Sequence, residues 1–212
     1  MSIYGPVIIN LKHREDRLKR ISSQFETYNL KYQVCDAIHN TSDGHSGCLA
    51  SHIKSLEMMP ETCDAIWICE DDCELTVGPT ELNDILDAFM KSDAVGICLG
   101  YRDLMSVPYN GRFRRTFGVF SGGCYLIKRS IYPIYLHIAK ISYKSKISGM
   151  PNPYEFIYYN FDVPERFACL NYADRFWQII MQSHVWLIPL KHVAIQYESY
   201  SDIQKMIANP GY

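Results

Sequence analysis

The 212-residue sequence has no apolar stretch that approaches the roughly 18 residues of a membrane span. Its first residues, MSIYGPVIINLKHRED, do not have the pattern that we expect of a signal peptide, and no internal repeat or low-complexity segment is visible. We therefore expect a cytoplasmic chain without a transmembrane segment. The sequence leaves open whether this chain is one part of a longer multidomain protein.

A surplus of positive charge is absent as well. The chain has 21 lysines and arginines against 23 aspartates and glutamates, a formal net charge of -2 at neutral pH. A protein that coats nucleic acid needs a basic surface to neutralise phosphates, so we expect no nucleic-acid partner. The length and the 48% content of hydrophobic residues are enough for one sizeable core. We expect a single domain over residues 1–212.

The eight cysteines contain no C-x2-C pair, the spacing typical of zinc ribbons and thiol redox motifs. Half of them lie inside apolar segments, where a thiol packs as a small hydrophobic group. Without a targeting signal, we interpret the cysteines as reduced thiols and not as a disulfide framework. The four cysteines in apolar segments are Cys69, Cys98, Cys124 and Cys169.

Apolar periodicity predicts strands that alternate with helices, which indicates an α/β protein with a mainly parallel central sheet. The segment 117–130 reads as two short strands separated by Gly122 and Gly123, followed by a helix. The segment 142–170 is rich in Tyr and Pro without a clear period, which favours an ordered lid. The remaining elements that we expect are strands at 6–10, 31–37, 65–69, 94–100 and 185–190 and helices at 13–28, 48–59, 79–91 and 173–182.

Three adjacent carboxylates, Glu70, Asp71 and Asp72, follow directly after the buried strand AIWIC. In a parallel α/β sheet, ligands bind beyond the carboxyl ends of the strands. Neighbouring carboxylates repel one another unless a cation or solvent relieves them, and Mg²⁺ binds through one or two protein carboxylates while phosphates complete its shell. We therefore expect a divalent metal here, with a solvated acidic turn as the alternative. Cys69 and Cys73 are not expected as ligands of that ion, because hard ions avoid thiolate.

The helix after the first strand begins with basic residues. Arg14 and Arg17 lie one turn before Leu18 and Ile21 on the same helix face, so they should point inward or along the sheet edge. Cations in a first turn oppose the helix dipole, and a bound phosphate would remove that cost. The alternative is a solvated basic face in which Arg14 pairs with local acids.

Three further residues are candidates by position. Asp36 ends the second strand, where it could contact a ribose or a base, or form a turn. Ser51 and His52 lie in a helix that follows a glycine-containing loop, and a lone histidine there is either structural or part of a site.

Several segments, in their order along the chain, resemble the lipopolysaccharide-type family 25 glycosyltransferases and, more broadly, nucleotide-sugar enzymes of the GT-A fold. The sequence is also similar to the glycosyltransferase domain of a large chlorovirus protein. The resemblance extends from about residue 6 to residue 203. The segments that carry it are VIINLKHREDRLKRI, GCLASHIKSLEMM, AIWICEDDCEL, FSGGCYLIKRS and ADRFWQIIMQSHVWLIPL.

The resemblance implies a GT-A-like, Rossmann-like fold with a nucleotide-sugar half over about 1–100 and an acceptor half over about 101–212. It implies that Asp72, with Glu70, binds Mn²⁺ or Mg²⁺, that Asp174 faces the acceptor, and that His184 or His192 is a candidate second metal ligand. The residues implied to hold the donor nucleotide or its sugar are Ile9, Asn10, Leu11, Arg14, Arg17, Asp36, Ser51, His52, Asp71, Gly122 and Gly123.

The function that follows from these expectations is transfer of a sugar from a UDP-sugar to a saccharide hydroxyl, with Asp174 as the base that accepts the hydroxyl proton. Asp174 also stands at a helix start, where its alternative role is an N-cap. One rival function is a nucleotide-sugar-binding module without turnover in a larger protein. A second rival is a metal-dependent phosphoesterase, although the other strand ends offer few further metal ligands.

Overall fold

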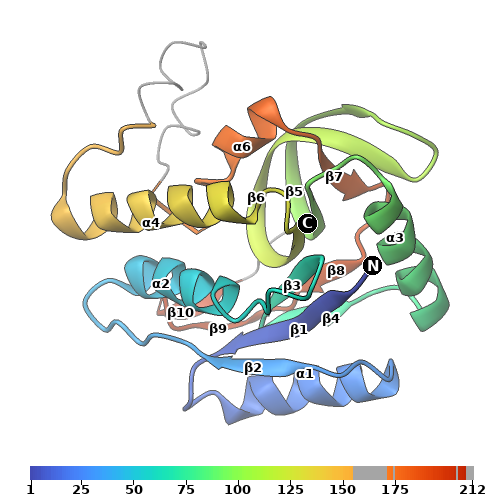
Figure 1. Cartoon of the computed structure of the whole chain (residues 1–212). Coiled ribbons are helices and arrows are strands. Elements are labelled where there is room, and N and C mark those ends of the chain that lie inside the picture. Colours follow the sequence, from blue (N-terminus) through green and yellow to red (C-terminus); the bar gives the residue numbers. More distant parts are fainter. Residues whose placement is uncertain (155–170, 174, 204, 209–212) are drawn as a thin grey trace.

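The protein is described here by a computed structural model, which describes residues 1–154, 171–173, 175–203 and 205–208 (Figure 1). Strands and helices alternate along the first part of the chain. In order the elements are β1 (Ile3–Asn10), α1 (Glu15–Thr27), β2 (Gln33–Asp36), α2 (Gly44–Leu56), β3 (Ala65–Glu70), β4 (Cys73–Leu75), α3 (Pro79–Lys91), β5 (Gly96–Pro108), β6 (Phe113–Lys128), α4 (Tyr132–Ser148), α6 (Gln178–Ser183), β7 (Trp186–Pro189), β8 (Ala194–Gln196), β9 (Ser199–Ser201) and β10 (Met206–Ala208).

A six-stranded sheet in the order β2-β1-β3-β6-β5-β7 forms the centre of the molecule. Neighbours β2, β1 and β3 run parallel, as do β5 and β7, whereas β6 runs antiparallel to its partners β3, β5 and β7. One strand, β6, therefore opposes the direction of the others. This arrangement confirms the predicted α/β class with a mainly parallel sheet.

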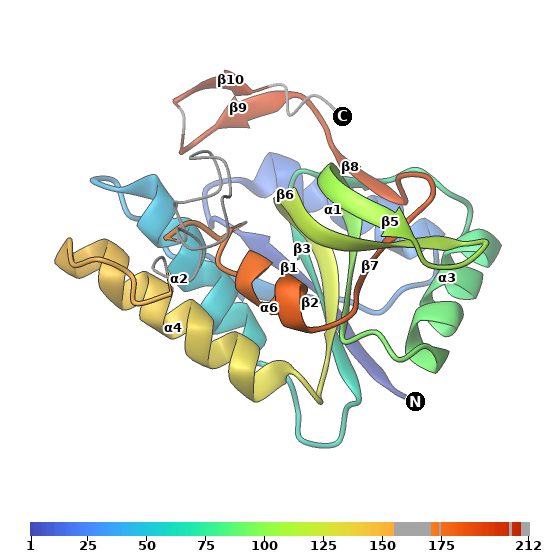
Figure 2. The same cartoon turned by 90° about the horizontal axis from the view of Figure 1, so that it is seen from above.

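Two layers of helices cover the sheet, because successive strand residues point to opposite faces. In β3, Ile66 and Ile68 pack on the face that α2, α4 and α6 cover, and Trp67 and Cys69 pack on the face of α1 and α3. Figure 2 shows α2, α4 and α6 together on one side. None of the helices in the described part of the chain is long and apolar enough to cross a membrane.

The expectation of two short strands around Gly122 and Gly123 is wrong. β6 continues through both glycines and pairs with β5 along most of its length. The register with β5 shifts there, because three residues of β6, Ser121 to Gly123, stand between the partners of Gly100 and Arg102, where β5 has one residue. Ser121 in this bulge adopts a left-handed backbone with φ of 74°. The long β5–β6 hairpin therefore brings the glycine pair beside β3.

Several helix boundaries differ from expectation. α2 begins at Gly44, ahead of the expected Cys48, because the Asp43 side chain accepts the backbone N–H groups of His45 and Ser46 as an N-cap. α4 extends into the segment expected to be irregular and ends at Gly149, whose φ is 68°. α6 begins only at Gln178. Most of the expected lid, residues 155–170, lies outside the described residues.

Candidate functional site

A cavity of about 580 Å³ opens where β1, β2 and β3 end. This is the edge of the sheet at which ligands usually bind in parallel α/β proteins. Figure 2 shows the β9–β10 hairpin at the same edge of the sheet, and residues of β9 and the following turn line the cavity. The predicted site residues that line it are Ile9, Leu11, Arg17, Ser51, Glu70, Asp71, Asp72 and Gly122.

Two side-chain amides contact different members of the acidic triplet. Asp71 is 6% exposed and accepts a hydrogen bond from Asn10 Nδ2 at 2.8 Å. Glu70 and Asp72 instead both accept from the Nε2 of Gln196, at 2.7 Å and 3.1 Å. Asn10 therefore lies behind the cavity wall, whereas Glu70 and Asp72 converge on one point inside it.

Arg17 and Arg14 have different roles. The buried Arg17 contacts Asp71 at 2.8 Å and Asp72 at 3.2 Å, so one guanidinium balances two carboxylates. Arg14 pairs with Asp16 and with Asp202 and does not line the cavity. Asp16 is a local acid, as the alternative for Arg14 expects, but Asp202 is distant in sequence and the Arg14 side chain is only 12% exposed, so this is not a solvated basic face.

The two cavity carboxylates differ in proton affinity. Burial, together with the charge of Glu70, raises the pKa of Asp72 to about 7, although Arg17 opposes the shift. Burial acts on Glu70 in the same direction, but the hydrogen bond and charge of His52 outweigh it and lower the pKa of Glu70. Near neutral pH, Glu70 is therefore ionised and Asp72 is close to its titration midpoint.

Ser51 and His52 position neighbouring groups of the site through hydrogen bonds. His52 is 1% exposed, and its Nε2 lies 3.0 Å from Glu70 while its Nδ1 lies 3.1 Å from the Tyr125 hydroxyl. The Ser51 hydroxyl accepts the Ile38 N–H at 2.8 Å and donates to the Gly47 carbonyl at 2.7 Å. His52 thus orients Glu70, and Ser51 fixes the chain segment that follows β2.

Two other predicted residues do not line the cavity, and a third lies outside the described residues. Asp36 is exposed at the end of β2 and lies 3.3 Å from the Lys12 ammonium. Gly123 leaves room for Gln196, because a Cβ at this position would stand 2.8 Å from the Gln196 Cγ. Asp174 lies outside the described residues, although its neighbours Ala173 and Arg175 line the cavity.

Sequence reasoning missed several residues that line the cavity, among them Gln196 and Arg175. Gln196 comes from the short strand β8, which reaches the triplet only because it pairs with β4 directly after Asp72. Arg175 lines the cavity with its guanidinium over the Tyr172 ring, 5.2 Å from the ring centroid. No local pattern marks Gln196, whereas Arg175 is adjacent to the predicted Asp174 and could have been considered with it.

The donor set at the triplet fits a hard divalent cation. Because one nitrogen of Gln196 contacts both Glu70 and Asp72, a single cation in place of this amide would contact both carboxylates. Two carboxylates are a usual protein contribution to a Mg²⁺ site. His184 and His192, the candidates for a further ligand, do not line the cavity.

The fold is similar to that of known structures, although no family model and no curated protein matches the sequence. A glycosyltransferase involved in the glycosylation of the major capsid of PBCV-1 aligns with a TM-score of 0.51 and 9% identity over 97% of both chains. Protein A197 from STIV aligns with a TM-score of 0.48 and 13% identity over 100% of this chain and 96% of that one. A Drosophila beta-1,4-galactosyltransferase 7 mutant in complex with manganese, UDP-Gal and xylobiose aligns with a TM-score of 0.46 and 13% identity, over 100% and 77% of the two chains.

At 9% identity, the first of these likenesses establishes the fold alone. Together with the sheet order, it confirms the predicted GT-A-like fold. The resemblance to family 25 stays a prediction, because no family model matches.

Proposed function

We propose that the protein is a glycosyltransferase that moves a sugar from a UDP-sugar donor to a saccharide hydroxyl, with Mn²⁺ or Mg²⁺ held by Asp72 and Glu70. The observation that carries this proposal is the pair of convergent carboxylates, beside the buried Arg17, in a large cavity at the carboxyl edge of the sheet. The shared fold with a capsid-glycosylating glycosyltransferase supports it.

The shape of the cavity supports binding of a donor nucleotide. Its volume of about 580 Å³ lies within the range of about 300 to 1,000 Å³ that is usual for small-molecule sites. Ile9 and Leu11 provide an apolar wall at the end of β1, suited to a nucleoside, and the charged groups lie beyond them. We place the diphosphate between Arg17 and Arg175, whose guanidinium groups match phosphate oxygens.

The chemical step breaks the bond between the anomeric carbon and the diphosphate, so negative charge develops on the leaving oxygen. A divalent metal on Asp72 and Glu70 supplies Lewis-acid stabilisation of that charge. Arg17 adds a fixed positive charge that costs no reorganisation during the reaction. His52 keeps Glu70 ionised and oriented through their 3.0 Å contact.

The acceptor hydroxyl must lose its proton as the new bond forms. We assign this step to Asp174, whose sequence neighbours Ala173 and Arg175 line the cavity. A carboxylate within hydrogen-bond reach of the hydroxyl would act as the general base.

The first test is calorimetric titration of UDP, with GDP as the control nucleotide, in the presence and absence of Mn²⁺. We expect Mn²⁺-dependent UDP binding that weakens at least tenfold in Asp72→Asn. Asp87→Asn, an exposed aspartate on α3 away from the cavity, should bind UDP like the wild type. Mn²⁺-dependent UDP binding that is weakened in Asp72→Asn and kept in Asp87→Asn would justify a screen of UDP-sugars against saccharide acceptors.

The rival functions predict other results. No binding of either nucleotide under any metal condition would contradict the proposal. Donor binding without transfer or donor hydrolysis over a broad acceptor panel would instead indicate a nucleotide-sugar-binding module. Release of inorganic phosphate from simple esters would indicate a phosphoesterase.

A further inference from the structure

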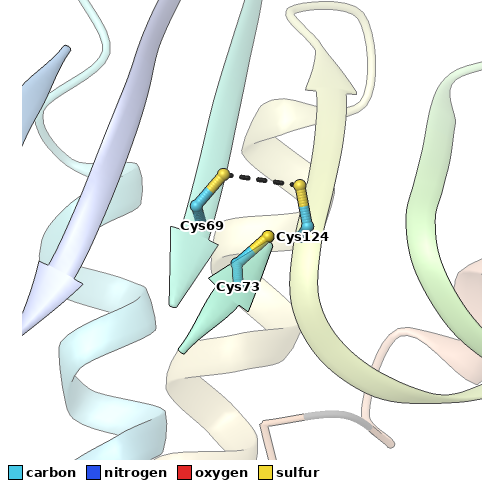
Figure 3. A group of neighbouring side chains, drawn as sticks. All are labelled: Cys69, Cys73 and Cys124. Carbon is cyan, nitrogen blue, oxygen red and sulfur yellow. Dashed lines mark hydrogen bonds between the residues drawn. The ribbon is translucent and has the colours of Figure 1, made fainter. Parts of the chain in front are cut away.

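Three cysteines from three different strands meet in the core next to the acidic triplet. Cys69 lies in β3, Cys73 begins β4, and Cys124 lies in β6 (Figure 3). Their sulfur atoms all lie within 4.8 Å of one another, and those of Cys69 and Cys124 are 3.4 Å apart. None of the three side chains is more than 2% exposed.

The strand register creates this group. Cys69 and Cys124 are directly opposite each other in the antiparallel pair β3–β6, so their side chains leave the sheet on the same face. After β3 the chain turns at the acidic triplet, and Cys73, the first residue of β4, places its sulfur beside those of Cys69 and Cys124. The indole Nε1 of Trp67 donates a hydrogen bond to the Cys124 sulfur at 3.2 Å. The sulfur atoms thus face one another and not the solvent.

We propose that Cys69, Cys73 and Cys124 form a binding site for one Cu(I) ion, separate from the hard-metal site at the triplet. Three sulfurs around a metal at the usual metal–thiolate distance of about 2.3 Å lie about 4 Å from one another. The observed separations, 3.4 Å for one pair and no more than 4.8 Å for any, bracket that value. Small side-chain rotations are therefore enough to create the site.

The chemistry of the group selects a soft ion with few ligands. Thiolate ligands favour Cu(I), and Mg²⁺ or Mn²⁺ prefers the oxygens of the triplet. Structural zinc takes four ligands, whereas this group, among the described residues, offers three ligand atoms. The three side chains are almost fully buried, which leaves bulk water little access as a fourth ligand.

Binding is coordination without a change of oxidation state. Cu(I) arrives already reduced, and each thiol that becomes a thiolate releases its proton to the solvent. Two thiolates and one thiol around Cu(I) leave a single negative charge, toward which the Trp67 N–H is directed. Such an outer hydrogen bond is a usual support for a metal ligand.

An ion at this place would join the two ends of the acidic triplet. Cys69 precedes Glu70, and Cys73 follows Asp72, so one Cu(I) would connect β3, β4 and β6 around the turn. Because an ion that binds the folded state stabilises it, we expect the midpoint of thermal unfolding to rise with Cu(I) concentration. Because the sulfurs are buried, we also expect binding to be slow and to require opening of this turn.

The test is an anaerobic titration of the fully reduced protein with Cu(I), buffered by the chelator bicinchoninate so that weak surface thiols do not compete. We expect one equivalent of Cu(I) and an X-ray absorption spectrum with three sulfur neighbours at about 2.3 Å. Cys73→Ala and Cys124→Ala should each weaken binding at least tenfold. Cys98→Ala is the matched control, because Cys98 is equally buried and accepts the Trp186 N–H at 3.2 Å.

A Cu(I) shell with fewer than three sulfurs in the wild type would overturn the proposal, and this result does not depend on whether any variant folds. Equal affinity of Cys73→Ala, Cys124→Ala and Cys98→Ala, each shown to be folded by circular dichroism, would also overturn it. A higher affinity of these three cysteines for Zn²⁺ than for Cu(I), measured by competition, would contradict the choice of ion. None of these readouts involves nucleotide binding, so they are independent of the proposed glycosyltransferase function.

Discussion

Replacement of Arg17 by methionine tests whether one guanidinium holds the acidic triplet together. Arg17 is 9% exposed and contacts Asp71 at 2.8 Å and Asp72 at 3.2 Å. It also donates to the Ser199 hydroxyl at 2.6 Å and to the Tyr200 carbonyl at 2.7 Å. Methionine keeps most of the side-chain volume but removes every one of these donors. Two buried carboxylates then lose their cation.

The expected loss of stability is large. Breaking a buried ion pair by removing one partner costs about 3 to 5 kcal/mol, because the remaining charge is buried without compensation. With a urea dependence of about 2 kcal/mol per molar, this loss lowers the urea midpoint of unfolding by about 2 M. We would measure it by circular dichroism during urea denaturation at neutral pH.

A second substitution separates this charge effect from lost packing. In Arg17→Met combined with Asp71→Asn, one uncompensated carboxylate is gone, so we expect the double variant to be more stable than Arg17→Met alone. Lys140→Met is the control, because its pair with Glu57 at 2.6 Å is about half exposed and such pairs contribute about 0 to 1 kcal/mol. A loss in Arg17→Met no larger than in Lys140→Met would refute the reasoning.

Two further predictions concern the residues around Arg17. Burial and Glu70 raise the pKa of Asp72 from 3.8 to about 7, so between these pH values the folded protein binds more protons than the unfolded chain. The free energy of unfolding should therefore fall as pH rises from about 5 to 8, and more steeply in the wild type than in Asp72→Asn. Parallel pH profiles of the two proteins in urea denaturation would contradict this prediction. His52→Ala should weaken Mn²⁺-dependent UDP binding by about 10- to 100-fold in calorimetry, because Glu70 loses the group that orients it. The control is His137→Ala, which replaces an exposed histidine and should bind UDP like the wild type. Equal affinities of the two variants would show that His52 has no such role.

Local patterns were enough for most of the elements near the site. The helix expected at 79–91 has the predicted bounds, because its proline start and its apolar stripe depend only on residues within one helix. The strand before the triplet was equally clear, since a short apolar run that ends in three charges has one plausible orientation. The strand break expected at the glycine pair is wrong because β6 accommodates these residues as a bulge, with pairing to β5 on both sides of it.

The presence of charged site residues at the strand ends could also be predicted, but which of these residues contact one another could not. The sequence indicated that Glu70, Asp71 and Asp72 need a cation and that Arg14 and Arg17 point inward or along the sheet edge. It did not distinguish Arg17, which contacts the triplet, from Arg14, which pairs with Asp16 and Asp202. That choice depends on where β9 and the following turn lie, more than 180 residues further along the chain.

By itself the sequence determined the α/β class, the position of the acidic triplet at a strand end and the burial of Cys69, Cys98 and Cys124. Tertiary structure alone decided that Gln196 donates to both Glu70 and Asp72. It also decided that the sulfur atoms of Cys69, Cys73 and Cys124 lie together in the core. The physical reason is the same in each case. Hydrophobic periodicity is a short-range property of the chain, whereas these contacts arise from the register between strands that are distant in sequence.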